Sequence, residues 1–465
     1  MIPRMKTQLF IPLFFVLALI NFSCSKEIPP LPDNLVLFEA TELGFTSEMS
    51  SKTITLQFLR PADAACHITL RLSAFNIDLQ QTLEITPQPV NGIITIPIAV
   101  GQTSGSIVLA RKPGVFMSGN ERIELAIDGT GGVLVVGERR NLNVRFASIV
   151  SEGTTMTLQG GTGGASAVNS VFVNFRSNTQ AQVERRSWDL GFWTGSEFRV
   201  ILNHTTAAAA IALNKFDLNQ VNGSDTVGVN LTVGPTNPNG MSLIDNVEGD
   251  LNRTIIGDVS ANDAENRVFI INRGTGGGIA ARPWMKVRIL RSANGYTLQY
   301  ARITETSFRT LHIPKDPAYN FVFVNFDTGI VRVEPRRTNW EIMWTGGVNR
   351  TLSGTTEVAH YFADQVFINH RAGITAAMVM TSNVTWDAFN ETHLAGLAMS
   401  SGRNIIGSNW RRVTGTPIGV FTDRFFVVRD AFGNFYKLRF LNFHTNDGGT
   451  RGFPNIEYRL VKRGG

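Results

Sequence analysis

Cysteine is almost absent from this chain, which has two in 465 residues, Cys24 and Cys66. So small a number excludes a disulfide framework and a zinc site built from cysteines. Cys66 stands in the alternating stretch AACHITLRL. We expect a buried structural thiol there, and not a nucleophile.

Charged residues are also scarce, at 17% of the chain against 43% for hydrophobic residues. Gly, Asn, Thr, Val and Phe are plentiful, and this balance is typical of strands joined by tight turns. The net charge of +6 is spread thinly, and no run of Lys or Arg forms a stripe that could follow a phosphate backbone. We therefore do not expect nucleic acid as a partner.

The apolar run near the N-terminus, LFIPLFFVLALI at residues 9–20, is short. It has about half of the ~20 residues that a membrane-spanning helix needs. Basic residues precede it and NFSCSKE follows, so we interpret residues 1–23 as a cleaved targeting segment. The arrangement resembles a bacterial lipoprotein signal. That resemblance implies lipidation of Cys24, a tether at residues 24–34, and a surface-exposed protein anchored in the bacterial outer membrane. The alternative is an ordinary cleaved signal with an incidental cysteine.

Residues 35–150 have the pattern of an antiparallel β-sandwich. Segments such as KTITLQFL, GIITIPIAV and ERIELAID alternate or cluster apolar residues, and turn signals at PQPVNG, GQTSG and DGTGG separate them. Their order is similar to that of Calx-beta or immunoglobulin-like modules. The acidic clusters that bind calcium in Calx-beta domains are not evident, so we expect a spacer or adhesion module without metal.

A glycine-rich stretch, GGTGGASAVN, follows this module. It does not match a phosphate-binding loop, because no Lys-Ser/Thr follows and a strand pattern opens after it. We therefore predict a linker at residues 151–169.

The rest of the chain repeats itself. VFVNF at residue 171 returns at residue 322, VERRSWDLGFWTG returns as VEPRRTNWEIMWTG, RVILNHTTAAAAIAL as QVFINHRAGITAAMV, and RTIIG as RNIIG. Nearly every shared landmark has strand character. The sequence thus predicts an all-β chain with two tandem, mutually similar domains, residues 170–315 and 316–465.

The ordered motifs of this region resemble the HmuY-like haem-binding lipoproteins of bacterial surfaces. The matching residues are Trp188, Asp189, Leu190, Gly191 and Phe192 in a first strand motif, Asn203 at the next strand end, and Gly433, Phe435, Lys437, Leu438 and Phe440 in a late hairpin. The second repeat keeps the corresponding Trp340 and Asn369 but replaces the aspartate with Glu341. The resemblance implies haem as cofactor, held by paired axial side chains, and delivery to an outer-membrane receptor.

The acidic residue of each motif also has an interpretation from the residues alone. Asp189 follows Trp188 on a strand and so points to the opposite face. We expect a structural role, in which it pairs with a nearby cation or binds backbone amides. Arg185 and Arg186, or the corresponding Arg336 and Arg337, are the expected partners.

Two of the seven histidines, His204 and His370, occur at matching places, in ILNH and FINH. A repeated Asn-His at a strand end is typical of a ligand-facing loop, and neutral imidazole can ligate haem iron. The two could serve one site if the strand ends meet. Otherwise the second ligand comes from Met378, Met380, His360 or His393. The structural alternative is that Asn-His completes a turn through side-chain hydrogen bonds to the backbone.

Enzyme signatures are missing: the chain has no HExxH, GxSxG or Walker motif. We expect a non-catalytic protein that captures a small hydrophobic ligand, with haem as the first candidate. The alternative is a glycan-binding or adhesion protein, in which Trp193 and Trp344 form sugar-stacking platforms and not core contacts. A hydrolase is the third hypothesis and has the least support.

Overall fold

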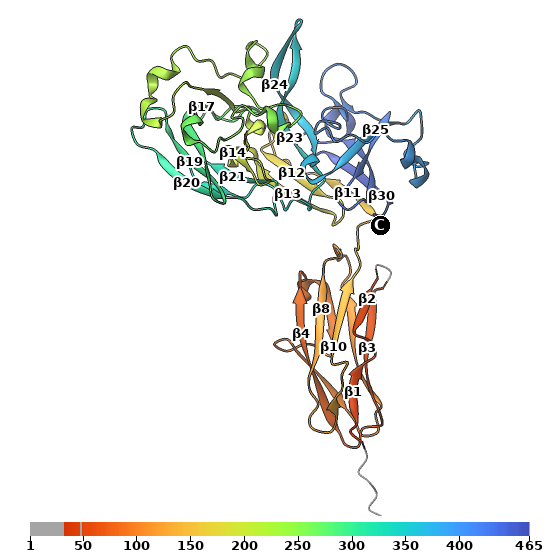
Figure 1. Ribbon diagram of the computed structural model, residues 1–465. Helices are drawn as coiled ribbons and strands as arrows, with labels where there is room; N and C mark the ends of the chain where they lie inside the picture. The colour runs from red at the N-terminus through yellow and green to blue at the C-terminus, as the bar shows by residue number, and fades with distance from the viewer. Residues whose placement is uncertain (1–31, 47–48, 465) are drawn as a thin grey trace, which may run out of the picture. The chain divides into compact units, whose positions relative to one another are not determined.

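The computed structural model describes residues 32–46 and 49–464, so Cys24 and the targeting segment lie outside the described residues. The chain divides between Ser148 and Ile149 into two compact units. Strands make up most of the regular structure of both units (Figure 1), which confirms the all-β prediction. Within the described part, no helix has the length and apolar character needed to cross a membrane.

The first unit is a sandwich of two five-stranded sheets. One sheet has the order β5-β7-β3-β1-β9, with bounds Leu83–Thr86, Ser104–Arg111, Ser51–Phe58, Leu35–Phe38 and Val135–Val136. The other has the order β2-β10-β8-β4-β6, with bounds Glu42–Phe45, Asn141–Phe146, Arg122–Gly129, Cys66–Phe75 and Ile93–Ile98. A four-residue helix, α1 (Leu79–Thr82), precedes β5.

Alternating burial along these strands produces the sandwich core, as in β6, where Ile94, Ile96 and Ile98 are all buried. The sandwich is mainly antiparallel, as predicted, but β1 pairs with β9 and β2 pairs with β10 in parallel. Cys66 begins β4 and is half-buried, so it is more exposed than the predicted core thiol. Burial raises the pKa of its thiol.

The second unit contains twenty strands, which we divide into a first half (β11–β19) and a second half (β20–β30). The first-half strands are β11 Gly153–Thr157, β12 Asn169–Asn174, β13 Thr179–Glu184, β14 Leu190–Trp193, β15 Val200–Leu202, β16 Ala209–Ala212, β17 Val268–Asn272, β18 Met285–Ser292 and β19 Gly295–Arg302. The second-half strands are β20 Arg309–Pro314, β21 Phe321–Asn325, β22 Gly329–Val331, β23 Ile342–Ser353, β24 Thr356–Ile368, β25 Thr375–Met380, β26 Arg411–Arg412, β27 Gly419–Val420, β28 Arg424–Arg429, β29 Phe435–Asn442 and β30 Asn455–Lys462.

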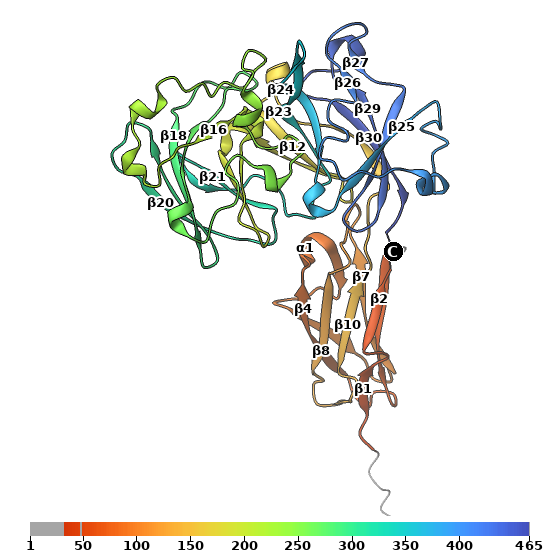
Figure 2. The ribbon, with the colours of Figure 1, turned by 45° about the horizontal axis from the view of Figure 1, so that its top comes forward.

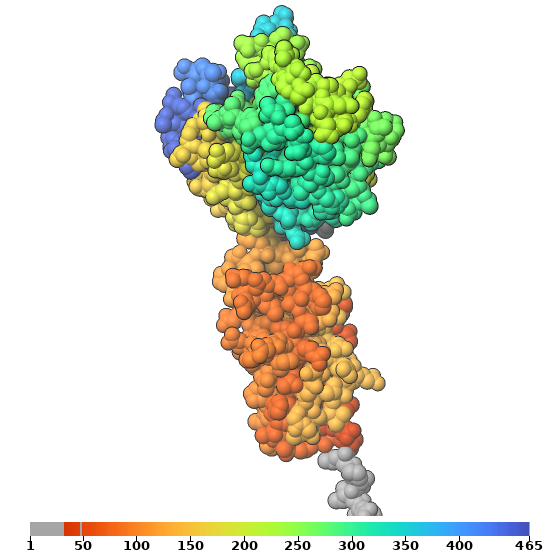
Figure 3. All heavy atoms as spheres, turned by 90° about the vertical axis from the view of Figure 1, so that its left-hand side faces the viewer, coloured from red at the N-terminus to blue at the C-terminus, as the bar shows by residue number. Residues whose placement is uncertain are grey.

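Short 3-10 helices lie between these strands. They are η1 Gly164–Ser166, η2 Arg185–Ser187, η3 His204–Thr206, η4 Leu218–Gln220, η5 Gly223–Thr226, η6 Gly240–Leu243, η7 Leu251–Arg253, η8 Asp263–Glu265, η9 His370–Ala372, η10 Glu391–Gly396 and η11 Thr445–Asp447. Figure 3 shows one face of this unit, which is covered largely by the segment from β16 to β20, in green to teal.

Two four-stranded sheets combine strands from both halves. Their orders are β13-β12-β23-β24 and β15-β14-β21-β22. The central strand β12 pairs with β23 of the other half (Figure 2), and the central strand β14 pairs with β21. The predicted domains 170–315 and 316–465 therefore do not fold as separate bodies. Most of the repeated motifs are strands, as the sequence pattern predicted, but RTIIG (253–257) and RNIIG (403–407) lie outside the strands. Which strands pair depends on contacts distant in sequence.

Two five-stranded sheets flank these central sheets, in the orders β16-β17-β18-β19-β20 and β11-β30-β29-β28-β25. The edge strand β11 lies inside the predicted linker 151–169 and pairs along its whole length with β30. The linker prediction is therefore wrong. One of its glycines, Gly160, lies so close to the core that a Cβ atom there would meet Cζ3 of Trp344 at 2.1 Å. Close packing, and not flexibility, explains this glycine.

Candidate functional site

Two tryptophans stand at corresponding places in the two halves. Trp188 precedes β14 and contacts Phe323 of β21 edge to face, with ring centroids 4.9 Å apart. Trp340 precedes β23 and contacts Phe172 of β12 in the same way, also at 4.9 Å. Each tryptophan therefore packs against a phenylalanine of the other half, and all four residues belong to one buried cluster.

The second tryptophans of the two motifs, Trp193 and Trp344, lie in different environments. Trp344 pairs with Val171 inside the core and is 2% exposed, as expected for core packing. Trp193 pairs with Phe321, is half-buried, and donates its indole N–H to Glu197 at 3.1 Å. When the two motifs are aligned on Trp188 and Trp340, Trp193 and Trp344 are offset by one residue.

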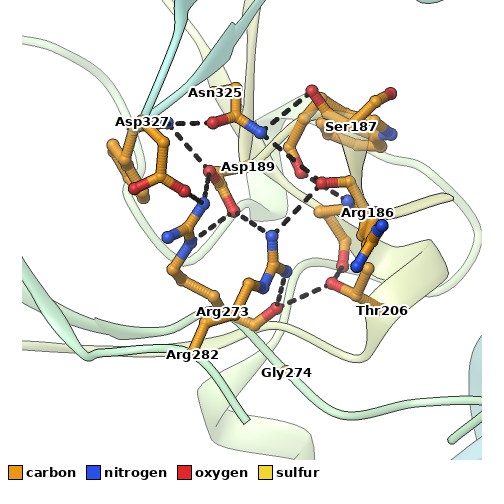
Figure 4. Close-up of polar contacts among 12 residues, drawn as sticks. Arg186, Ser187, Asp189, Thr206, Arg273, Gly274, Arg282, Asn325 and Asp327 are labelled. Atoms are coloured by element: carbon orange, nitrogen blue, oxygen red, sulfur yellow. Dashed lines mark hydrogen bonds and ion pairs between the residues drawn. The ribbon is translucent and has the colours of Figure 1, made fainter. Parts of the chain in front are cut away.

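Asp189 forms a buried ion pair, but not with the predicted arginines. Its carboxylate accepts hydrogen bonds from Nε and Nη2 of Arg273 at 2.9 and 2.7 Å, and lies 3.1 Å from Arg282 (Figure 4). It also accepts the backbone N–H of Phe326 at 2.9 Å, as the amide-binding alternative predicted. Arg185 instead donates to backbone carbonyls, including that of Ala167 at 2.8 Å. The partners come from beyond β17, which spacing along the sequence could not reveal.

Glu341 occupies the corresponding place in the second half, since its Oε2 accepts the N–H of Phe175 at 2.6 Å. The acidic and basic residues around it have exchanged places relative to the first half. Asp430 follows β28 at the position where Arg273 follows β17. Arg176 follows β12 at the position where Asp327 follows β21. Burial, together with the charge of Asp430, raises the pKa of Glu341 to about 8. The predicted partners Arg336 and Arg337 do not form an ion pair with it in the described part of the chain.

The asparagines before the two histidines fix turns, as the structural alternative predicted. Nδ2 of Asn203 donates to the carbonyls of Arg185 and Trp188 at 2.8 and 2.6 Å. Nδ2 of Asn369 makes the corresponding bonds to Arg337 and Trp340 at 2.7 and 3.1 Å. The two strand ends therefore have the same local construction, and each places a histidine at the start of a 3-10 helix.

His204 and His370 line one cavity of about 100 Å³. Its apolar walls are Phe172, Trp188, Ile201, Leu251, Phe321, Phe323, Val333, Trp340, Met343, Phe367 and Ile368. A neighbouring cavity of about 30 Å³ shares His204 and Arg403 with it. The two strand ends thus contribute a histidine each to the same cavity, which one two-histidine site would require.

Both imidazoles are held neutral. Burial lowers the pKa of His204 well below its usual value, and the charge of Arg403 lowers it further. Burial, with Arg371 and Arg403, lowers the pKa of His370 to about 3. Nδ1 of His204 and Nε2 of His370 are buried and have no hydrogen-bond partner. A neutral imidazole has one nitrogen with the lone pair that a metal ligand requires, and an unpartnered nitrogen is free to be that one.

The four predicted second ligands do not line this cavity. Met378 is 41% exposed on β25, where its sulfur lies 3.9 Å from Arg424, and Met380 is half-buried at the end of that strand. His360 packs edge to face on Phe362, and His393 caps η10. Within the described residues, no group of three or more His, Cys, Asp and Glu side chains is placed to hold a metal ion.

Among the lining residues that sequence reasoning missed are Met343, Arg371 and Arg403. Met343 pairs with Phe172, and Gly191 pairs with Phe323 at the corresponding place in the other half. The second half therefore has a thioether side chain where the first half has no side chain. The departure of WEIMW from WDLGF was the available signal. Arg403 lies in RNIIG, whose repetition was noted without a role.

Comparisons with solved structures give only weak likenesses. A proposed carbohydrate-binding protein from Bacteroides ovatus ATCC 8483 is 10% identical, over 93% of this chain and 98% of that chain, with a TM-score of 0.21. A Calx CBD1 domain without bound ligand is 5% identical, over 25% of this chain and 97% of that chain, also with a TM-score of 0.21. At these TM-scores, neither likeness defines a shared fold. No curated protein matches the chain.

A family model gives the informative match. The model described as HmuY protein matches residues 166–458, which is more than half of the chain and includes both histidines and both motif tryptophans. The chain therefore belongs to the HmuY family.

Proposed function

We propose that this protein is a non-catalytic surface lipoprotein that captures a small hydrophobic ligand in the cavity between His204 and His370, with haem as the first candidate. One observation carries the proposal: several residues that line this cavity have buried polar atoms without a hydrogen-bond partner. Buried polar groups are nearly always hydrogen-bonded, so several unpaired groups in one place indicate a missing partner. The buried unpaired atoms that belong to cavity residues are His204 Nδ1, His370 Nε2, Arg403 Nε, Trp340 Nε1 and Asn320 Oδ1.

The residues present suit haem in their chemistry. Two neutral imidazoles from opposite halves supply the nitrogen ligands that haem iron accepts, and the walls between them are aromatic. Haem, once bound, would supply an iron centre and a flat apolar face. His204 and His370 would hold the iron, while Trp188 and Trp340 would cover the ring system and exclude water.

The space is smaller than haem requires. Small-molecule sites usually measure about 300–1,000 Å³, whereas this cavity measures about 100 Å³. The segment 245–253, which we name the strap, contributes Gly249 and Leu251 to the walls. It is held by Arg403 and Asn404, which donate to the carbonyl of Val247 at 2.7 and 3.0 Å. Haem binding therefore requires the strap to move outward.

A haem titration tests the proposal. The purified chain from residue 25 onward is expected to develop a sharp Soret band, and His204→Ala and His370→Ala are each expected to shift and weaken it. His393→Ala is the matched control, because that histidine caps η10 away from the cavity. An unchanged spectrum on adding haem, or equal effects of all three variants, would refute haem ligation at this site.

The lipid anchor belongs to the same proposal. Cys24 would attach the chain to the outer membrane, facing outward, and the ligand would pass to an outer-membrane receptor. The support is the sequence around Cys24 and the family membership. Radiolabelled palmitate should label the wild-type protein in cells and not a Cys24→Ala variant. Labelling of both would contradict the anchor.

Glycan binding is the second candidate, and a surface groove favours it. This groove of about 330 Å³ lies along β21 and β22 and has the volume of an ordinary small-molecule site. Tyr319 stands in it with the Arg332 guanidinium 3.8 Å from its ring. Retention of the protein on a polysaccharide matrix, lost in Tyr319→Ala or Trp193→Ala, would favour this candidate. Glycan arrays without any binding signal would argue against it.

We also propose that the two halves arose by tandem duplication. The support is the matching construction around Trp188 and Trp340, around Asn203 and Asn369, and in the two mixed sheets. Superposition of β11–β19 on β20–β30 in an experimental structure tests this origin. Failure of those strands to superimpose would contradict it.

A further inference from the structure

Two arginines bring positive charge into the cavity without acidic partners. Arg371 and Arg403 both line it, and no described carboxylate oxygen lies within 4.0 Å of either guanidinium. Their hydrogen bonds go to backbone carbonyls of the strap: Arg371 donates to Gly249, and Arg403 donates to Val247 at 2.7 Å. Nε of Arg403 is buried and unpartnered.

The acids whose charges act on Arg403 are already engaged, and the two that act on Arg371, namely Asp250 and Glu197, lie beyond ion-pair distance. The carboxylate of Asp245 accepts the N–H groups of Leu202 and Ile255 at 2.6 and 2.9 Å. Glu248 forms an ion pair with Arg350 at 3.1 Å. Across the cavity, Glu334 accepts the N–H of Asn320 at 2.6 Å.

The other titratable groups that line the cavity are His204, His370 and Glu334. His204 and His370 are neutral, because burial depresses the pKa of each ring. Burial and the backbone bonds act in opposite directions on Glu334, and burial prevails to raise its pKa to about 7. The two arginine charges thus lie beside aromatic walls without an ion-pair partner, and acidic side chains act on them only at longer range. Burying such charge without a partner is costly.

We infer that the ligand of this cavity carries a carboxylate on an apolar, aromatic-faced body, and that Arg371 and Arg403 receive the carboxylate. The inference rests on the proposed function, in that the cavity is taken as the ligand site. Arginine presents planar N–H groups that match a carboxylate, and Arg403 has a free Nε–H to offer. Trp188, Trp340 and Phe367 would contact the body of the ligand.

Two classes of ligand carry a carboxylate on an aromatic body: a porphyrin with carboxylate side chains and a small aromatic acid. The experiment therefore uses two matched pairs of probes on the full mature chain. Haem is compared with its dimethyl ester, and benzoate is compared with benzamide, which has the same ring without the charge. Binding is followed by quenching of tryptophan fluorescence, because Trp188 and Trp340 line the cavity, and by Soret absorbance for the haem pair.

Arg403→Gln is the main variant, since glutamine keeps a donor for the Val247 carbonyl but loses the charge. Arg371→Gln repeats the test at a second position, and Arg459→Gln on β30, half exposed and remote from the cavity lining, is the control. Near-ultraviolet circular dichroism of each variant checks the fold. If Arg403→Gln fails to fold, Arg371→Gln carries the test.

The expected result is that the wild-type chain prefers the acid in at least one pair by about tenfold or more, the scale of one charge-assisted hydrogen bond. The preference should vanish in Arg403→Gln or Arg371→Gln and persist in Arg459→Gln. Equal binding of acid and neutral analogue, or equal loss of both in the variants, would overturn the inference while leaving capture of the ligand intact. Preference for benzoate with no response to haem would support the inference and refute haem as the ligand. No response to any probe would refute both.

Discussion

The carboxylate of Asp189 receives two hydrogen bonds from the guanidinium of Arg273, at 2.9 and 2.7 Å, and neither side chain is more than 2% exposed. Arg273 also bonds Asp327 at 2.7 Å, so it links β14, the end of β17 and the turn after β21 (Figure 4). Through its bond to Asp327, Arg273 therefore joins the two halves of the second unit.

Removing one partner of this pair should be costly. Arg273→Met leaves the Asp189 carboxylate buried with Arg282 as its remaining ion-pair partner, and loss of one partner of a buried pair costs about 3–5 kcal/mol. Urea unfolding of the variant should show a loss of that size. Arg291→Met, which breaks the half-exposed pair with Asp258, is the control and should cost about 1 kcal/mol or less. Equal losses would contradict a structural role for the motif aspartate.

Glu341 should make stability depend on pH. Its pKa is raised from 4.5 to about 8 by burial and by Asp430. The contribution of the protonated side chain to the free energy of unfolding is therefore complete below about pH 4.5 and is lost as the pH rises through about 8. Glu341→Gln keeps an acceptor for the N–H of Phe175 and removes the titration.

The variant and the wild-type protein should therefore unfold alike near pH 4.5. At pH 9 the variant should be the more stable. The gap should widen by up to about 1.4 kcal/mol per pH unit between pH 4.5 and about pH 8, and should stay constant above that. Thermal or urea unfolding across this range measures the gap. A gap that stays constant with pH would contradict the raised pKa.

Separating the two halves should unfold both of them. β12 pairs with β23, β14 with β21 and β11 with β30, so fragments ending at residue 306 and beginning at residue 307 each lack the partners of their central strands. Tryptophan emission and near-ultraviolet circular dichroism should show native signals only after the fragments are mixed. A cut between Ser148 and Ile149, where the compact units divide, is the control and should leave both pieces folded. Native signals from the second fragment alone would contradict the pairing of strands between the two halves.

A methyl group at residue 160 should disturb the core. Gly160→Ala would place Cβ 2.1 Å from Cζ3 of Trp344, a contact that forces the indole or the backbone to shift. Overpacking of this kind costs about 1–3 kcal/mol. Gly223→Ala is the control, because no atom lies within 4 Å of its added Cβ. Denaturant midpoints of the two variants measure the difference, and equal midpoints would restore the linker interpretation.

Loosening the strap should change how fast haem enters. Asn404→Ala removes the donor to the carbonyl of Val247 at 3.0 Å and to Glu248 at 3.2 Å, while leaving the cavity walls intact. Stopped-flow mixing with haem should show faster association and the same final Soret position. Asn409→Ala, which removes an exposed bond to Ile405, should leave the rate unchanged. Identical rates in both variants would show that the strap does not limit entry.

Local patterns in the sequence determined much of this structure. Alternation of apolar residues specified strands, because side chains of a strand point alternately to its two faces. The repeated Asn-His specified two equivalent strand ends, since each asparagine bonds the backbone within its own turn. The match of Trp188 with Trp340 likewise followed from the order of motifs.

Contacts between distant residues were beyond such patterns. Only the tertiary structure decided that β12 pairs with β23, that Arg273 and not Arg185 neutralises Asp189, and that His204 and His370 face one cavity. The physical reason is that periodicity fixes the face on which a side chain lies, whereas strand pairing depends on how whole sheets bury their apolar faces against each other. Residues far apart in the chain therefore meet for reasons that neither local segment contains.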